Sequence, residues 1–486
     1  MVTFIIAIIA LIIGYMLYGK LAERIIAPDP NRQTPAYTMQ DGVDYMPMPT
    51  WKIFMIQFLN IAGLGPIFGA VSGALFGTAA YIWIVAGCIF IGAVHDYMAG
   101  MLSLRDGGSN LPEIIGKYLG NKAQLIMRIF TIILMMMVGA VFVSGPAGIL
   151  NNITPDWMGS TFWIVVIFIY YIIATLLPID KIIGKIYPIF AFALIFMALG
   201  VLAMLLFGGY GASLPEITDG ISNQHPAAEN TPIFPILCIT IACGAISGFH
   251  ATQSPLMARC LKNENLGRKV FYGSMIAEGI IAIIWAAAAI WYYQEIGTQE
   301  TKAANIVDFI TKTYLGQFGA ILALLGVVFA PITSGDTALR SCRLIIADFL
   351  KIDQKTISKR LMICVPLFVA TAGLIVFSLA SPEGFGIIWR YFGWSNQALS
   401  VFTLWAITVY LARMRKPWII TMLPAVFMTV VCVTYLFIAP ECFRAIESLK
   451  PILTDSVGYT VGALSGIAAM ALFLSWKARF QQQNGL

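Results

Sequence analysis

Long apolar runs recur along the whole chain, separated by short polar loops. A helix needs about 20 apolar residues to cross the hydrocarbon core of a bilayer. Of all residues, 59% are hydrophobic and 11% are charged, whereas soluble domains carry about 25% charged residues. The missing charge indicates a surface that faces lipid, so the chain is predicted to be an all-α polytopic membrane protein.

Thirteen segments are predicted to be transmembrane helices. They cover 2–18, 51–77, 80–102, 125–150, 161–177, 186–207, 233–251, 270–293, 318–340, 362–380, 387–411, 418–438 and 457–476. The first has no basic stretch before it and no small-residue cleavage motif after it. A retained helix is therefore expected there, not a signal peptide.

The distribution of lysine and arginine predicts how these helices are threaded. With the N-terminus outside, all but five of the 30 Lys and Arg residues fall on the cytoplasmic side. The exceptions are Lys302, Lys312, Arg390, Arg444 and Lys450. Adding or removing one helix would scramble this bias, which favours thirteen spans and a cytoplasmic C-terminus. The net charge of +6 is then a signal of membrane topology, and no nucleic acid is expected as a partner.

Two of the predicted helices are interrupted by glycine, proline and small polar residues. The breaks lie at 60–66 and 243–255. Gly and Pro free backbone groups from the helix, and inside a membrane such groups are tolerated only where protein or a water-filled cavity satisfies them. Tight helix packing is the alternative explanation for the glycines. The predicted solute-binding residues are Asn60, Gly63, Gly65, Pro66, Gly244, Ser247, Gly248, His250, Asn396 and Gln397.

Each interrupted helix opens a set of five helices. Because five is odd, the second set enters the membrane from the opposite side, as in inverted repeats that place a binding site at the midplane. The predicted organisation is an N-terminal helix and loop over 1–50, a first repeat over 51–209 and an inverted second repeat over 232–412. Two further helices over 417–476 and a tail over 477–486 follow.

Ionisable residues inside the predicted spans are costly to bury and usually functional. His95 and Asp96 lie in the third span, and Glu278, a candidate proton carrier, lies in the eighth. Each has a structural alternative: Asp96 could simply hold His95 in place, and Glu278 could be the buried partner of a neighbouring Arg or Ser. His250, beside the second break, is the histidine expected at the site.

A second polar cluster follows Pro331 in the ninth span. Thr333, Ser334 and Asp336 offer oxygen atoms suited to a small cation or a proton relay. A helix cap is the structural alternative.

Signatures of enzymes and of metal sites are missing from the sequence. It contains no H-E-x-x-H, G-x-S-x-G or P-loop motif. The eight cysteines include no C-x-x-C pair, and they are interpreted as small packing residues. We therefore expect no catalytic residue, metal or cofactor, and any pumping must use a gradient of H⁺ or Na⁺.

At several ordered motifs the chain resembles the carbon starvation protein A family of bacterial transporters. The resemblance runs from about Gly14 to the end of the twelfth predicted helix. The matching segments lie at 34–36, 41–47, 61–66, 103–109, 178–185, 244–250, 333–338 and 391–397.

This resemblance implies uptake of peptides or pyruvate when preferred carbon runs out, and a fold like that of the leucine transporter. It also implies that Thr333, Ser334 and Asp336 face an ion site shared with backbone carbonyls near Ala62. Two departures stand out. The family's His pair before the first break is replaced here by Ile56 and Gln57, and the chain looks like a short form without further C-terminal helices.

Together these observations predict an ion-coupled symporter of the bacterial inner membrane for a small solute with a carboxylate. The positive end of a half-helix would attract that carboxylate. An amino-acid symporter of the same fold is the first alternative, and a channel or a transporter-derived nutrient sensor is the second. The oligomeric state is left open.

Overall fold

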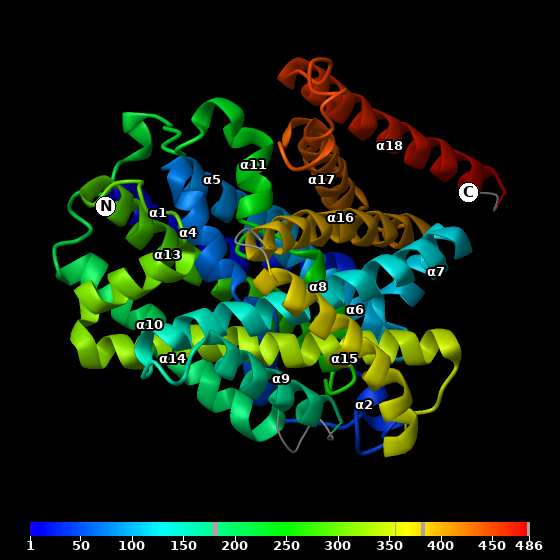
Figure 1. Ribbon diagram of the computed structural model, residues 1–486. Helices are drawn as coiled ribbons and strands as arrows, with labels where there is room; N and C mark the ends of the chain where they lie inside the picture. Colours follow the sequence, from blue (N-terminus) through cyan, green and yellow to red (C-terminus); the bar gives the residue numbers. More distant parts are fainter. Residues whose placement is uncertain (177–182, 355, 381–383, 484–486) are drawn as a thin grey trace.

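Helices account for the regular structure of the computed structural model, which describes residues 1–176, 183–354, 356–380 and 384–483 (Figure 1). No strand occurs within these described ranges. The first half contains α1 (Val2–Ile26), α2 (Pro35–Thr38), α3 (Thr50–Ala62), α4 (Ala70–Gly73), α5 (Ala79–Ala86), α6 (Ala93–Arg105), α7 (Leu111–Leu119), α8 (Asn121–Ile153), α9 (Ser160–Leu176) and α10 (Ile183–Phe207). The second half contains α11 (Ile233–Thr240), α12 (Gly248–Ala258), α13 (Gly273–Glu295), α14 (Ala303–Leu350), α15 (Ile357–Ala380), α16 (Gly384–Arg413), α17 (Ile419–Ile438) and α18 (Asp455–Gln483).

A helix or interrupted helix occupies each of the thirteen predicted positions. By length and composition, nine helices of the described residues could cross a membrane, or up to ten if the bent pair is one span. Helix α9 is apolar but shorter than these over its described part. The all-α polytopic class is confirmed, and the count of thirteen spans stays a prediction.

Large apolar side chains face outward on the peripheral helices. Leu17 on α1, Ile126 on α8 and Val369 on α15 are all at least 60% exposed. A soluble monomer rarely exposes contiguous apolar surface of this kind, whereas a bilayer requires it of any helix that borders lipid.

Helix α14 packs on α8, α10 and α3. Helices α17 and α18 stand to one side, orange and red in Figure 1, and α18 packs mainly on α17. The last two helices therefore lie at the edge of the bundle, and the division of the other helices into two repeats stays a prediction.

Both predicted breaks are present. Helix α3 ends at Ala62, and the helix that resumes over Gly65–Phe76 is bent from it by 50°. Gly63 has φ +34°, in the left-handed region that a residue with a side chain rarely adopts. The second break is longer than the first, and it lies earlier than the predicted 243–255. The chain leaves the helix after Thr240 and re-enters it at Gly248, so residues 248–255 belong to α12.

The short helix α7 follows the third span. It begins at Leu111, with Asn110 at the cap position and Pro112 in the first turn. The Ser109 hydroxyl donates to the carbonyl of Asp106 at 2.5 Å, so it stabilises the turn that precedes α7.

Candidate transport site at the two broken helices

The two breaks touch each other in the buried centre of the bundle. A Cβ atom placed on Gly65 would lie 2.2 Å from Cβ and 2.3 Å from Sγ of Cys243. One turn further on, a Cβ on Gly69 would lie 2.8 Å from the carbonyl oxygen of Thr240. Glycine is required on this face because it lets the backbones of the two broken helices approach closely.

Helix α16 supplies the polar groups that hold the second break. The Asn396 side-chain oxygen accepts hydrogen bonds from the Phe249 N–H at 2.6 Å and from the Ser247 hydroxyl at 2.9 Å. The Gln397 amide donates to the carbonyl of Cys238 at 2.9 Å. Asn396 thus acts as a cap for α12, so the structure places both predicted residues at the break, bound to protein.

Four ionisable side chains form a buried chain beside the second break. One carboxylate oxygen of Asp96 is hydrogen-bonded to His95 Nδ1, and the other is hydrogen-bonded to His250 Nδ1, each at 2.8 Å. His250 Nε2 lies 3.5 Å from an oxygen of Glu278 on α13. All four side chains are fully buried. The alternative that Asp96 holds His95 is confirmed, but Asp96 holds His250 as well.

The structural alternative for Glu278, a neighbouring Arg or Ser as its buried partner, is wrong, because its partner is a histidine. Within the described ranges, His250 is the ion-pair partner of Glu278, and both carboxylate oxygens have no hydrogen bond. A carboxylate that is buried without such bonds is costly, so this position favours a chemical role.

Helix α14 meets the first broken helix through Ser334. The Ser334 hydroxyl bonds to the carbonyl of Leu59 at 2.7 Å, and a Cβ on Gly63 would lie 3.5 Å from Ser334 Oγ. The Thr333 hydroxyl bonds to carbonyls of its own helix, while Asp336 accepts from the Tyr170 hydroxyl of α9 at 3.4 Å. Ser334 and Gly63 are therefore brought together near Ala62, and the role of all three polar residues as ion ligands stays a prediction.

Two amides of α3 lie one turn apart before the first break. Asn60 was predicted as a site residue, and Gln57 was noted only as a departure from a family pattern. Both are fully buried, and no hydrogen bond to their side-chain oxygen or nitrogen atoms occurs among the described residues. Since burying an unsatisfied amide costs free energy, both are suited to bind a polar ligand. Gln57 could have been recognised as a candidate site residue from the sequence, because it is a polar residue inside an apolar segment.

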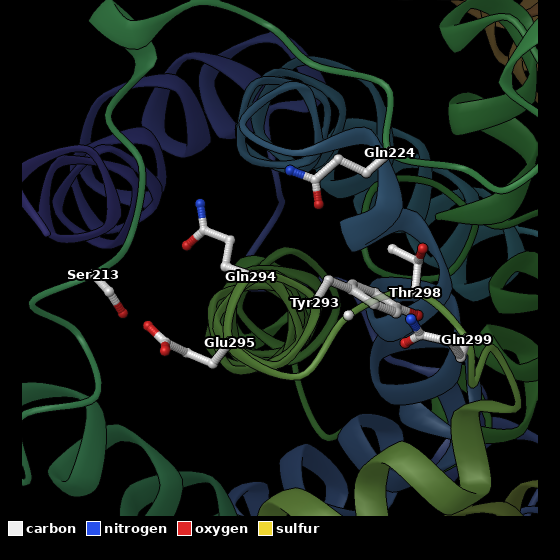
Figure 2. A pocket seen from close by; sticks show the side chains of 8 residues that line it. Ser213, Gln224, Tyr293, Gln294, Glu295, Thr298 and Gln299 are labelled. Carbon is white, nitrogen blue, oxygen red and sulfur yellow. The ribbon is translucent and has the colours of Figure 1, made fainter.

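A hollow of about 600 Å³ lies outside this centre, at the carboxyl end of α13. Figure 2 shows the polar side chains around it, including Gln224, Gln294 and Glu295. The Gln224 N–H donates to the carbonyl of Leu75, at the end of the first broken helix, at 2.7 Å. None of the predicted site residues lines the hollow, so it is separate from the predicted site.

Three side chains that could hold a metal ion meet at the second break, although the sequence shows no metal-site signature and the expectation of no metal stays untested. Cys243, His250 and Glu278 each present a ligand atom, and these atoms lie within 4.8 Å of one another. Cys243 had been interpreted as a packing residue. Sequence reasoning missed the cluster because its members come from the second break and from α13, without any characteristic spacing.

The fold defines a class of protein. Two solved structures share this fold. The first is an Eremococcus coleocola manganese transporter, which is 13% identical with a TM-score of 0.57 and covers 91% of this chain and 99% of its own. The second is MhsT in complex with L-phenylalanine, which is 13% identical with a TM-score of 0.54 and covers 86% of this chain and 97% of its own. The chain thus has the leucine-transporter-like fold of secondary transporters, as predicted.

The family model described as carbon starvation protein CstA matches residues 1–160, 147–308 and 292–435. The chain belongs to this family of transporters, as the motifs predicted, and it is not an enzyme. The peptide transporter CstA of Campylobacter jejuni is 28% identical over 551 residues, covering 87% of this chain and 78% of that protein.

Two further relatives cover less of this chain. An uncharacterized membrane protein of Haemophilus influenzae is 44% identical over 340 residues, with 60% of this chain and 92% of that protein covered. The pyruvate/proton symporter BtsT of Escherichia coli is 28% identical over 334 residues, with 57% and 46% covered. The matching region thus spans less than half the length of that symporter.

Proposed function

We propose that this chain is an ion-coupled symporter that takes up a small solute bearing a carboxylate, such as pyruvate or a short peptide. The observation that carries the proposal is the contact of two inverted helix breaks, Gly65 against Cys243, in the buried centre of the bundle. Discontinuous helices of this kind bind solutes and coupling ions at the midplane of secondary transporters. The names of the peptide-transporting and pyruvate-transporting relatives support the solute class.

The first break is the better candidate for binding the carboxylate. At the second break, the Phe249 N–H and the Ser247 hydroxyl already bond to Asn396. The helix that resumes at Gly65 directs its positive end towards the first break. The amides of Asn60 and Gln57 lie one and two turns before the break, without hydrogen bonds in the described structure. An anionic solute here would satisfy groups that the protein leaves unsatisfied.

The coupling ion in this proposal is H⁺ or Na⁺, and no bound cofactor is needed. For Na⁺, the Ser334 hydroxyl and the carbonyls at the end of α3 supply hard oxygen ligands. In this proposal the protein lies in the inner membrane with its N-terminus outside and its C-terminus in the cytoplasm, an orientation that the distribution of Lys and Arg residues supports. Its role would be nutrient uptake during carbon starvation.

Uptake by the purified protein in proteoliposomes tests this function. Labelled pyruvate and a labelled dipeptide are each supplied under an imposed proton gradient and, separately, under a sodium gradient. We expect one solute to accumulate above its equilibrium concentration under one of the gradients, which names the coupling ion.

Competition by unlabelled amino acids separates the main alternative from this proposal. If only an amino acid competes and accumulates, the chain is an amino-acid symporter of the same fold. If the solute only equilibrates across the membrane, at a rate that neither gradient changes, the chain is a channel. If the solute binds but is not transported, the chain is a sensor. Either result contradicts the symporter.

A further inference from the structure

We propose that Cys243, His250 and Glu278 form a binding site for a divalent first-row transition metal ion of the zinc type. The three ligand atoms are fully buried and lie within 4.8 Å of one another. One thiolate, one imidazole and one carboxylate form a ligand set that suits zinc or cobalt better than magnesium or calcium, which take oxygen ligands.

The distances allow a metal to bind with small side-chain movements. Zinc bonds of about 2.0–2.3 Å put tetrahedral ligand atoms roughly 3.3–3.8 Å apart. His250 Nε2 and the Glu278 oxygen are already 3.5 Å apart. That separation is too long for a strong hydrogen bond, but it matches two ligands that share one ion.

Asp96 orients the imidazole as a metal ligand requires. It binds His250 Nδ1 at 2.8 Å, which directs Nε2 towards Glu278 on the opposite side of the ring. A carboxylate that holds the second nitrogen of a ligating histidine is a recurrent feature of metal sites, where it fixes the tautomer and raises the basicity of the ring. Asp96 in turn is held by His95 at 2.8 Å.

The thiol of Cys243 is also positioned. The Asn396 amide donates to Cys243 Sγ at 3.7 Å, and this donor stabilises a thiolate. A cation would further offset the charge of the two buried carboxylates, Asp96 and Glu278, whose ion-pair partners among the described residues are histidines. Geometry, orientation and charge therefore all favour a bound divalent cation.

The site spans a part of the protein that must move if the chain is a transporter. Cys243 belongs to the non-helical segment of the second break, His250 to α12 and Glu278 to α13. A bound ion would tie the break to α13 and slow any rearrangement of α12. Inhibition of uptake by zinc is thus expected, and this consequence alone rests on the proposed function.

Cobalt binding to the intact protein in lipid nanodiscs tests the site directly. The affinity tag should contain no histidine, so that Co²⁺ binds only to the chain. We expect one Co²⁺ per chain, displaced by Zn²⁺, with a near-ultraviolet thiolate-to-cobalt absorption band. Cys243→Ser should abolish the band and raise the Kd at least about tenfold, whereas the matched variant Cys238→Ser, in the neighbouring α11, should keep both.

Two further variants keep the test decisive if Cys243→Ser is poorly folded. Glu278→Gln should weaken Co²⁺ binding while the thiolate band persists at saturation, and Asp96→Asn should raise the Kd about 10–100-fold. No saturable Co²⁺ binding to the wild type, or an unchanged band in folded Cys243→Ser, would overturn the proposal. Because the readout is metal binding, a failure of solute uptake leaves this result standing.

Discussion

Gly65, at the centre of this bundle, controls how closely the two broken helices approach each other. It has no side chain, and Cys243 of the other broken helix occupies the space where one would be. Core side chains interdigitate with few voids, so even one extra methyl group at this contact forces the two breaks apart. The effect should depend on Cys243 and can be reversed by removing its side chain.

Substituting Gly65 therefore tests the contact between the breaks. Gly65→Leu should abolish uptake while the protein still inserts into the membrane. Gly65→Ala should reduce uptake strongly, because overpacking costs about 1–3 kcal/mol. The double variant Gly65→Ala/Cys243→Gly should recover uptake, since the nearest remaining atom is Cys243 Cα at 3.5 Å.

A glycine without neighbours supplies the control. Gly148 on α8 has no atom within 4 Å of an added Cβ, so Gly148→Ala should transport like the wild type. Normal uptake by Gly65→Leu, or no rescue in the double variant, would contradict a site at the breaks.

Ser334 is the second residue with a clear individual test. Its hydroxyl bonds across to Leu59 on α3, whereas the Thr337 hydroxyl bonds only to carbonyls of its own helix, those of Thr333 and Ser334. If Ser334 is an ion ligand, Ser334→Ala should raise the half-saturating concentration of the coupling ion about tenfold, as expected for a lost bond to a charged group. Thr337→Ala should change it less than twofold. Equal effects of the two variants in ion-dependent uptake would exclude the ligand role.

At the scale of elements, α18 is attached to the bundle by a stripe of small residues. Gly458, Gly462 and Gly466 recur every four residues and face α17. A Cβ on Gly462 would lie 1.9 Å from the Thr434 hydroxyl oxygen. This is the small-residue packing by which helices associate in lipid, where the hydrophobic effect does not hold them together.

Gly462→Val should thus release α18 from α17 while uptake by the rest of the chain persists. Limited proteolysis of the protein in nanodiscs, followed at the segment between α17 and α18, measures the release as faster cleavage. The neighbouring Ala463 is exposed, so Ala463→Val changes the same helix on its outer face and should leave cleavage unchanged. Equal cleavage rates for both variants would show that the glycine stripe does not hold α18.

At the scale of the whole molecule, buried ion pairs join segments that are far apart in the sequence. Asp44, in the loop before α3, lies 3.3 Å from Arg340 and 3.7 Å from Arg343, both on α14. Glu264, between α12 and α13, binds Arg105, at the end of α6, at 2.8 Å. Any rearrangement that parts these segments requires that the ion pairs separate.

Asp44 should make stability depend on pH. Burial opposes its ionisation, but Arg340, Arg343 and Arg259 outweigh burial and hold the pKa of Asp44 below its usual value of 3.8. Its contribution to stability is present above that value and is lost as the pH falls through the lowered pKa of the folded state.

Thermal unfolding in detergent between pH 2.5 and 7 measures this contribution. Asp44→Asn should destabilise the protein by about 3–5 kcal/mol at pH 7, because buried arginines lose their partner, and it should remove part of the acid sensitivity. The exposed Asp156 provides the control variant Asp156→Asn, for which a wild-type profile is expected. A wild-type acid profile in Asp44→Asn would show that the ion pairs of Asp44 do not stabilise the fold.

The sequence by itself determined the positions of the helices and of both breaks. Hydrocarbon thickness sets the length of each apolar run, and Gly63, Gly65 and Pro66 interrupt a helix through their own backbone chemistry. These are local properties, so they can be recognised without knowledge of the neighbours. The motifs at the same breaks also carried the family resemblance.

Only the tertiary structure decided which side chains meet. Asn396 caps α12, Asp96 joins His95 to His250, and Glu278 approaches His250. Each of these contacts between helices joins residues that no periodic pattern in the sequence pairs with each other. The packing of the two broken helices against α13 and α16 thus converts residues that look isolated in the sequence into one buried polar cluster.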